Sequence, residues 1–189
     1  MRISGGLARG RIVKAPKGVD LRPTEERVRQ ALFNILAPIL AGCRFLDLFS
    51  GTGAVGLEAL SRGAGFVSFV DKESRCLKSA ESHSAEFGFP AESSDFIRAE
   101  YPQALAKLAG KTPGYDVVFV DPPYESEAAL DALRLLGGLA ILNKQAQARI
   151  ILEHPTKLLL PSTQGALQLL RQYKYGNTSL SFFAESHAD

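Results

Sequence analysis

The stretch from Phe45 to Leu60 most constrains what this 189-residue chain can fold into. It begins with an apolar run of strand length, continues through a turn rich in glycine, and ends with leucines at helical spacing. Gly51, Gly53 and Gly56 form a G-x-G-x-x-G pattern, which lets a ligand approach the backbone at the start of a helix. The stretch predicts a strand, a turn and a helix with a ligand at the turn. A tight βα turn without a ligand can have the same sequence pattern.

An acidic residue four positions before the first glycine indicates the kind of ligand. Asp47 lies near the end of the expected strand, where the pyrophosphate of a dinucleotide would meet a like charge. The amino group and sulfonium of S-adenosylmethionine are cationic, and the same acid would attract them. We therefore predict S-adenosylmethionine as the cofactor.

Length and composition favour one core domain with appendages, because 46% of the residues are hydrophobic. No apolar stretch has membrane-spanning length and the first residues lack the apolar segment of a signal peptide, so we expect a cytoplasmic protein without a membrane partner. Cys43 and Cys76 are isolated and lack metal-ligand spacing. We expect reduced thiols and no metal site.

Positive charge is concentrated at the amino-terminal end. Residues 1–30 hold eight Lys/Arg and three Asp/Glu, whereas the rest of the chain holds fourteen and seventeen. Two short runs, Arg2–Gly6 and Gly10–Lys14, are separated by turn residues and predict a small basic hairpin outside the core. Such a hairpin can contact phosphates, although a solvated charged surface would have the same composition.

A helix is expected after this hairpin. Thr24 is a good N-cap residue, apolar side chains then recur at helical spacing, and Pro38 is expected to end the helix. Arg27 and Arg29 lie off the apolar stripe and Arg22 precedes the cap, so we predict that all three are free to contact a partner. The alternative is that they serve solubility alone.

A second strand, from Phe66 to Asp71, ends in an acid twenty-four positions after Asp47. An acid at this point can accept hydrogen bonds from both hydroxyls of a ribose, which makes Asp71 a candidate cofactor contact. It could instead cap the helix that follows.

The segment from Ala91 to Phe96 has a poor strand composition, yet its position between two helices calls for a strand. If it is one, Asp95 lies at the same edge as Asp47 and Asp71, where it could accept the adenine amino group while Phe96 covers the ring. An exposed turn is the competing interpretation.

A buried parallel strand is predicted from Tyr115 to Val120, and Asp121-Pro122-Pro123-Tyr124 follows it. The prolines cannot donate hydrogen bonds, so this tetrapeptide presents acceptors beside an aromatic ring. An exocyclic NH2 group on a planar base needs this combination, although two prolines after a strand can also form a plain rigid turn.

The remaining elements complete an alternating α/β pattern. We predict a helix through Leu130 to Leu136, a strand from Arg149 to Glu153, and a closing antiparallel hairpin whose strands flank Gly176-Asn177. Glu153 ends a strand and could line the site or be a surface acid, and the three histidines are interpreted as structural or facing solvent.

Taken together, the sequence resembles the RsmD-type bacterial methyltransferases, which methylate N2 of a guanine (guanine 966 by this resemblance) in 16S rRNA. The matching pieces are Arg2–Gly6 with Arg9-Gly10-Arg11, Leu21–Thr24 with Arg27-Val28-Arg29, Leu46–Arg62, Val118–Tyr124 and the region of Tyr175-Gly176. The resemblance implies a Rossmann-like class I fold with seven mostly parallel strands, in which residues 1–38 form an RNA-contacting extension and residues 39–189 the catalytic domain.

The predicted site residues fall into three groups. Those expected to bind the cofactor are Asp47, Phe49, Gly51, Gly53, Asp71, Lys72, Asp95 and Phe96; those expected to place the base are Asp121, Pro122, Pro123 and Tyr124. Those expected to contact RNA are Arg2, Arg9, Arg11, Arg22, Thr24, Arg27 and Arg29. The expected partner is 16S rRNA within a small-subunit particle, and the protein is expected to be a monomer.

Three other functions remain open from the sequence. An adenine-N6 methyltransferase acting on DNA would use the same Asp-Pro-Pro-Tyr motif, although the chain is short for an added DNA-recognition domain. A nicotinamide-dependent oxidoreductase would use the literal G-x-G-x-x-G. A non-catalytic RNA-binding module would have kept only a vestigial pocket.

Overall fold

A computed structural model describes residues 1–16, 26–123, 127–144 and 147–186. Helices and strands alternate through most of the chain, as the sequence predicted. In chain order the elements are α1 (Glu26–Leu40), β1 (Arg44–Leu48), α2 (Ala54–Ser61), β2 (Phe66–Asp71), α3 (Ser74–Glu86), the 3-10 turn η1 (Ala91–Ser93), β3 (Ser94–Arg98), α4 (Tyr101–Leu108), β4 (Val117–Val120), α5 (Ala128–Leu136), β5 (Arg149–Pro155), β6 (Thr163–Gln164), β7 (Leu167–Tyr175) and β8 (Thr178–Glu185).

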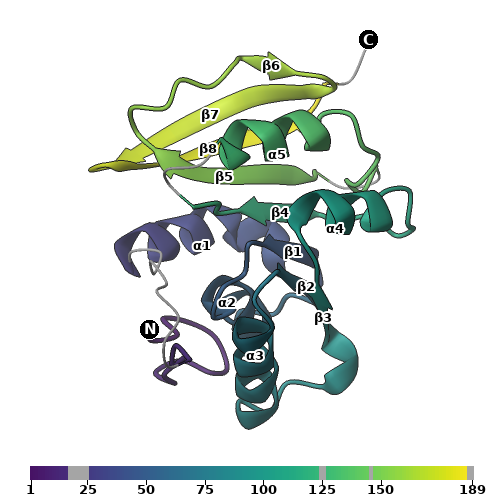
Figure 1. Ribbon diagram of the computed structural model, residues 1–189. Helices are drawn as coiled ribbons and strands as arrows, with labels where there is room; N and C mark the ends of the chain where they lie inside the picture. Colours follow the sequence, from purple (N-terminus) through teal and green to yellow (C-terminus); the bar gives the residue numbers. More distant parts are fainter. Residues whose placement is uncertain (17–25, 124–126, 145–146, 187–189) are drawn as a thin grey trace.

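The strands form a single sheet in the order β3-β2-β1-β4-β5-β8-β7-β6 (Figure 1). The first five are parallel, and β8 pairs antiparallel with β5. Strand order reverses between β1 and β4, since β2 and β3 lie on one side of β1 and the later strands on the other. In open α/β sheets a ligand binds outside the carboxyl ends of the strands at such a switch point.

Helices cover both faces of the sheet, which explains why the central strands are apolar without alternation. One face packs on α1, α2 and α3 in a cluster that includes Phe33, Leu57 and Phe69, and the other packs on α4 and α5 in a cluster that includes Leu105 and Leu133. The sheet is therefore buried on both sides at its centre, and only its edges are available for ligands.

The described residues contain eight strands rather than the seven expected. The additional strand is β6, a two-residue edge strand that pairs with β7. The closing hairpin of β7 and β8 is confirmed, with the turn at Gly176-Asn177. Two residues carry too little pattern to be recognised as a strand in a sequence, because the period of two needs several residues to become visible.

The amino-terminal hairpin does not lie outside the core as expected. A bridge joins Arg2 to Ile12, and the side chains of Ile3 and Val13 are buried in the same cluster as α1 and α2. Ile3 and Val13 therefore fix the hairpin to the helices, while Arg2 and Ile12, which form the bridge, face outward.

Helix α1 also differs from the expectation that Pro38 ends it. The helix includes Pro38 and continues to Leu40, whose side chain is buried. Proline has a helical φ and removes only the hydrogen bond of its own N–H, so it is tolerated close to a helix end when the next residues are held by packing. The boundary expected at residue 38 therefore falls inside a helix.

Among the described helices, none is both long enough and apolar enough to cross a membrane.

Candidate functional site

The two sequence motifs lie at the same edge of the sheet. Strands β1 and β4 are adjacent and parallel, and Leu48 pairs with Val120, so the glycine turn and the Asp-Pro-Pro segment leave the sheet side by side. The backbone N–H of Asp121 donates to the carbonyl of Leu48 at 3.4 Å. The geometry thus brings an expected cofactor turn next to an expected base-binding segment.

The turn after β1 has an unusual backbone. Phe49 is the only non-glycine residue with a positive φ among the described residues, at 68°, and Gly51 and Gly53 have φ of 51° and 75°. A bulky residue at positive φ is costly and is found mostly where the surrounding structure imposes it, typically at functional sites. Phe49 and the two glycines therefore turn the chain sharply between β1 and α2.

The third glycine has a packing role. A Cβ atom on Gly56 would lie 2.3 Å from the Cε1 atom of Phe69, which is fully buried. A Cβ atom on Gly53 would lie 2.6 Å from the Cβ of Ala80. The glycines of the pattern therefore allow α2 to pack closely on β2 and α3, in addition to shaping the turn.

Asp47 is buried beneath the turn, with 2% of its surface exposed. Its Oδ2 atom accepts a hydrogen bond from the N–H of Gly56 at 2.9 Å. Burial raises the pKa of Asp47 to about 7, the hydrogen bond from Gly56 opposes this, and the charges of Asp121 and Asp71 raise it further. Three acids from three strand ends thus make a region that favours a cation.

Asp71 joins the turn to the second strand. Its Oδ2 atom accepts the N–H of Gly51 at 2.7 Å, and its Oδ1 atom accepts the N–H of Glu73 at 2.8 Å. Each carboxylate oxygen can accept a second hydrogen bond, so these contacts leave capacity for ligand hydroxyls. Asp71 therefore orients the glycine turn and also accepts a backbone N–H just before α3, as the capping alternative expected, while its contact with a ribose stays a prediction.

The structure contradicts the expected positions of Asp95 and Phe96. In the parallel register Asp95 pairs with Ser68 and Phe96 with Phe69, whereas the strand-end residue Asp71 pairs with Arg98. The ring of Phe96 stacks on Phe69 with centroids 4.9 Å apart. The strand begins later than predicted, because Ala91–Ser93 form a 3-10 turn, so Asp95 and Phe96 lie within the strand and Arg98 is at its carboxyl end.

Different side chains lie at the carboxyl end of β3. Lys72 and Glu100 form an exposed ion pair with a separation of 3.7 Å. The ring of Tyr101 lies 5.0 Å from that of Phe49, and its hydroxyl donates to Asp131 at 2.6 Å. That hydrogen bond, with smaller effects of burial and charge, raises the pKa of Tyr101 to about 12. The sequence analysis missed Tyr101 because it belongs to no recognisable motif. A correct end for β3, at Arg98, would have placed Tyr101 at this edge of the sheet.

The Asp-Pro-Pro segment follows β4 directly. Pro122 is buried, whereas Asp121 is partly exposed and Pro123 is exposed. Tyr124, predicted to stack on a base, lies outside the described residues, as do Arg22 and Thr24. Asp121 is thus the acid of this segment, and it lies at the sheet edge directly after β4.

The arginines of the amino-terminal hairpin lie away from the edge that carries the glycine turn. The hairpin contacts the last turns of α2 and α3: the N–H of Leu7 donates to the carbonyl of Ser61, and the guanidinium of Arg11 donates to the carbonyl of Glu86 and lies over the ring of Phe87. These turns are at the opposite ends of the helices from the glycine turn. Arg2 and Arg9 are exposed, as is Arg27 at the start of α1.

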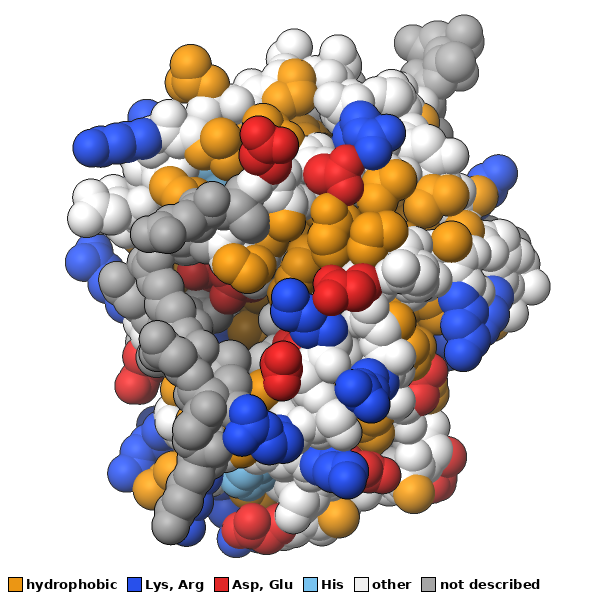
Figure 2. Space-filling view, viewed as in Figure 1, with side chains coloured by type: hydrophobic (Ala, Val, Ile, Leu, Met, Phe, Trp, Pro, Cys, Tyr) orange, Lys and Arg blue, Asp and Glu red, His pale blue; other side chains and the backbone are white. Residues whose placement is uncertain are grey.

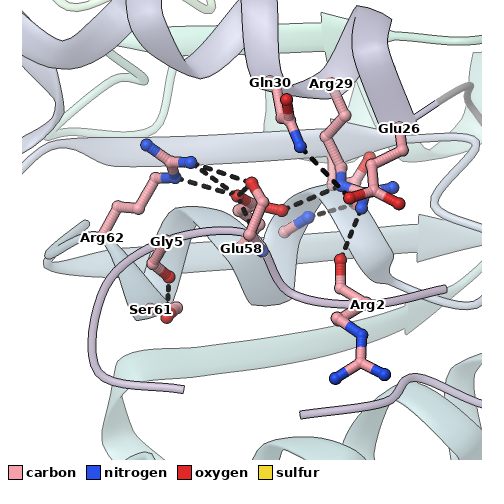
Figure 3. A network of polar contacts seen from close by, with 11 residues as sticks. Arg2, Gly5, Glu26, Arg29, Gln30, Glu58, Ser61 and Arg62 are labelled. Carbon is pink, nitrogen blue, oxygen red and sulfur yellow. Dashed lines mark hydrogen bonds and ion pairs between the residues drawn. The ribbon is translucent and has the colours of Figure 1, made fainter. Parts of the chain in front are cut away.

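Arg29 was predicted to reach a partner, and this is wrong. Its side chain is 1% exposed and its Nε donates to Oε2 of Glu58, a fully buried acid on α2, at 2.8 Å (Figure 3). Arg62 contacts the other oxygen of Glu58 at 2.9 Å, and Ser4 also donates to it. Glu58 is fully buried among apolar residues of α2, and a buried acid needs cationic partners, here Arg29 from α1 and Arg62 at the end of α2.

The polar network around Glu58 lowers the pKa of its carboxyl group. Burial raises the pKa of Glu58, but the hydrogen bonds from Ser4, Arg29 and Arg62 outweigh it and hold the pKa below its ordinary value. Arg29 also donates to the backbone carbonyl of Arg2 at 2.6 Å. The network therefore ties the hairpin and α1 to the helix that follows the glycine turn.

The two cysteines lie in the interior of the protein. Both are free and buried, and burial raises the pKa of Cys43 to about 12 and also raises that of Cys76. Over the part of the chain that the structure describes, no group of three or more His, Cys, Asp or Glu residues could hold a metal ion.

The order of the sheet, its reversed hairpin and the glycine turn at the switch point are those of the class I S-adenosylmethionine-dependent methyltransferases. A putative methyltransferase of Escherichia coli, yhhF, has the same fold with a TM-score of 0.82 at 29% identity, over 100% of this chain and 99% of that one. The family model described as conserved hypothetical protein 95 matches residues 1–184, and the chain belongs to this family, the RsmD family.

Two relatives extend over nearly the whole chain. The putative rRNA methyltransferase YlbH of Bacillus subtilis is 32% identical, with 97% of this chain and 98% of that protein covered. The ribosomal RNA small subunit methyltransferase D of Escherichia coli is also 32% identical, with 100% and 94% covered. The resemblance expected from the motifs is therefore confirmed.

Proposed function

We propose that this chain transfers a methyl group from S-adenosylmethionine to the exocyclic N2 of a guanine in 16S rRNA. The observation that supports the proposal is the adjacency of the Asp47 glycine turn and the Asp121-Pro122-Pro123 segment on two neighbouring parallel strands. An in-line transfer needs its two reactants held together, and most of the acceleration comes from such positioning.

The residues of the turn fit the cofactor. Asp47 is a buried acid between two other acids, an arrangement that a nearby cation would stabilise. The hydroxyl of Ser50, within the turn, is buried and has no hydrogen-bond partner among the described residues, so it is available to a ligand. When bound, S-adenosylmethionine supplies an electrophilic methyl group on its sulfonium. Asp71 and Gly53 would complete the cradle.

The residues after β4 would orient the acceptor. The Asp121 carboxylate and the carbonyls of the proline segment accept the hydrogens of an exocyclic amino group, which directs the nitrogen lone pair toward the methyl carbon. Tyr124 is proposed to stack on the base. Once methylated the amine becomes acidic, and its proton leaves to Asp121 or to water without a tuned base.

The proposed partner is 16S rRNA within a small-subunit particle, because the Escherichia coli relative is named for the small-subunit RNA. Exposed arginines of the hairpin and of α1, namely Arg2, Arg9 and Arg27, are proposed to contact its phosphates. Arg11 also donates a hydrogen bond to α3, so only part of its guanidinium would face RNA. Arg22 and Thr24 are proposed to contact RNA, as predicted from the sequence. We propose that the chain acts as a monomer.

Mass spectrometry of nucleosides tests the proposal. Purified protein, S-adenosylmethionine and small ribosomal subunits that lack the modification are expected to yield N2-methylguanosine, whereas duplex DNA is expected to yield no N6-methyladenine. Methylation of DNA alone would favour the adenine enzyme, tight cofactor binding without any turnover would favour a binding module, and binding of NADH without S-adenosylmethionine would favour the oxidoreductase.

A single-turnover experiment tests the role of Asp121. We expect Asp121→Ala to lose far more than tenfold in rate, and a loss within about tenfold, equivalent to ~1.4 kcal/mol of barrier, would remove Asp121 from its assigned role. Glu81→Gln, a change of an exposed acid on α3, is the control and is expected to leave the rate unchanged.

A further inference from the structure

The tip of the β7–β8 hairpin lies at the same edge of the sheet as the proposed active site. Thr178 pairs with Pro155 at the carboxyl end of β5, and β5 is the neighbour of β4, which carries Asp121. Adjacent strands are about 4.8 Å apart, so β7 lies roughly 14 Å, three strand spacings, from β4. Figure 1 shows the hairpin tip and the start of α1 on the same side of the molecule.

Aromatic and basic side chains gather on one face of this hairpin. Arg171, Tyr173 and Tyr175 alternate along β7 and share the face on which Leu180 and Phe182 join the cluster with α1. The Nη1 atom of Arg171 donates to the Tyr173 hydroxyl at 3.2 Å, and its guanidinium lies 5.9 Å from the centre of that ring.

The tyrosine rings are held in place by the protein beneath them. Tyr173 packs edge to face on Phe182 with centroids 5.6 Å apart. Both Tyr173 and Tyr175 are half-buried, whereas Arg171 is exposed. Rings that are partly covered and already ordered can stack on a ligand at a small entropic cost.

A further arginine comes from α1. Burial, with a smaller effect of Tyr173, raises the pKa of Tyr175, and the charge of the exposed Arg27 opposes this, so Arg27 lies within electrostatic reach of that tyrosine. The carboxylate of the neighbouring Glu26 accepts a hydrogen bond from Gln30 at 3.1 Å. In Figure 2, Lys and Arg side chains are spread over the view, including the left, where Figure 1 places the hairpin tip.

We propose that Tyr173, Tyr175, Arg171 and Arg27 form a second RNA-contacting face, which binds single-stranded nucleotides adjoining the target guanine. Bases stack on aromatic side chains whatever their sequence, and arginines neutralise the phosphates between them. The basic amino-terminal hairpin contacts the far ends of α2 and α3, whereas this face lies at the catalytic edge. The inference rests on the proposed function.

Steady-state kinetics on small ribosomal subunits test this face. Tyr175→Ala and Tyr173→Ala are each expected to raise the KM for RNA about tenfold, the loss of one stacked base, with the Kd of S-adenosylmethionine unchanged. Tyr175→Phe keeps the ring and is expected to restore the wild-type KM, which a role of the hydroxyl in folding would not do.

The salt dependence of the KM tests whether Arg171 contacts a phosphate. Arg171→Gln is expected to raise the KM for RNA and to reduce the slope of log KM against log salt concentration by about 0.7 to 1, the effect of one phosphate contact. Two controls change exposed residues away from the face: Gln168→Ala at the base of the hairpin, and Lys111→Gln at the amino edge of the sheet. Both are expected to leave the KM and the slope unchanged.

Three outcomes would overturn the inference. An unchanged KM for Tyr175→Ala would rule out the stacking role, and an equally raised KM in Tyr175→Phe would assign the effect to the hydroxyl. If the alanine variants raised the KM on assembled subunits but not on protein-free rRNA, the face would bind a ribosomal protein. In each case a wild-type enzyme that still methylates the RNA keeps the proposed function, whereas wild-type protein that methylates no RNA refutes the function itself.

Discussion

Replacing Arg29 tests directly whether this residue is a structural arginine. Arg29→Met keeps the apolar length of the side chain but removes the donors to Oε2 of Glu58 and to the carbonyl of Arg2, both in a region where the side chain is 1% exposed. Removing one partner of a buried ion pair costs about 3 to 5 kcal/mol. Because Arg62 and Ser4 still serve the other oxygen of Glu58, we expect a loss of about 3 kcal/mol, at the lower end of that range.

The assay is urea and thermal unfolding followed by circular dichroism. For a chain of this length each kcal/mol shifts Tm by about 2 to 4 °C, so Arg29→Met should melt roughly 6 to 12 °C below the wild type. The pKa of Glu58 is lowered in the folded state, so its contribution is present above its unfolded pKa and is lost as the pH falls through the folded pKa. The difference between the two proteins should therefore shrink in acid.

Arg27→Met is the matched control, because Arg27 lies two residues away on the same helix and is exposed. It is expected to change stability by no more than about 0.5 kcal/mol. If Arg29→Met also cost less than about 1 kcal/mol, or if it impaired RNA binding while leaving stability intact, the assignment of Arg29 to the buried network would be refuted.

Three further perturbations follow from the structure. Gly56→Ala should destabilise by about 1 to 3 kcal/mol through overlap with Phe69, whereas Gly138→Ala, which meets only an ordinary contact, should be near neutral in the same unfolding assay. The pKa of Asp47 is raised to about 7, so the stability that its protonated form contributes is lost as pH rises through 7. In urea titrations at pH 8 without cofactor, Asp47→Asn should therefore be more stable than the wild type. A less stable variant would contradict this. Burial lowers the pKa of His154, against a smaller opposing effect of the Pro155 carbonyl, so stability should fall as pH drops below the unfolded value near 6.5. Titration of the histidine Cε1–H signal by NMR checks this directly.

The central part of the fold could be predicted from the sequence because its signals are local. The apolar run before Gly51 and the run before Asp121 each specify a buried parallel strand, and the sheet pairs them as neighbours. Carboxyl ends of parallel strands share one edge, so placing each motif at a strand end was enough to bring the two motifs together.

The amino-terminal part could be predicted less well, since its placement depends on contacts with distant residues. Arg29 precedes Phe33 by four residues and Leu36 by seven, so it lies on the buried face of α1, and only its charge had assigned it to solvent. Its burial is decided by Glu58, which is twenty-nine positions away and reaches it only after α1 packs on α2. No pattern within α1 records that partner.

What the sequence by itself determined was the alternating helices and strands of the central sheet, the adjacency of the two strands that carry the motifs, and the family to which the chain belongs. Only the tertiary structure decided the register of β3, which places Asp95 and Phe96 within the strand, and the ion pair of Arg29 with Glu58. Periodicity and turn chemistry act over a few residues and can be recognised in a sequence, whereas register and long-range electrostatic contacts depend on which surfaces pack together.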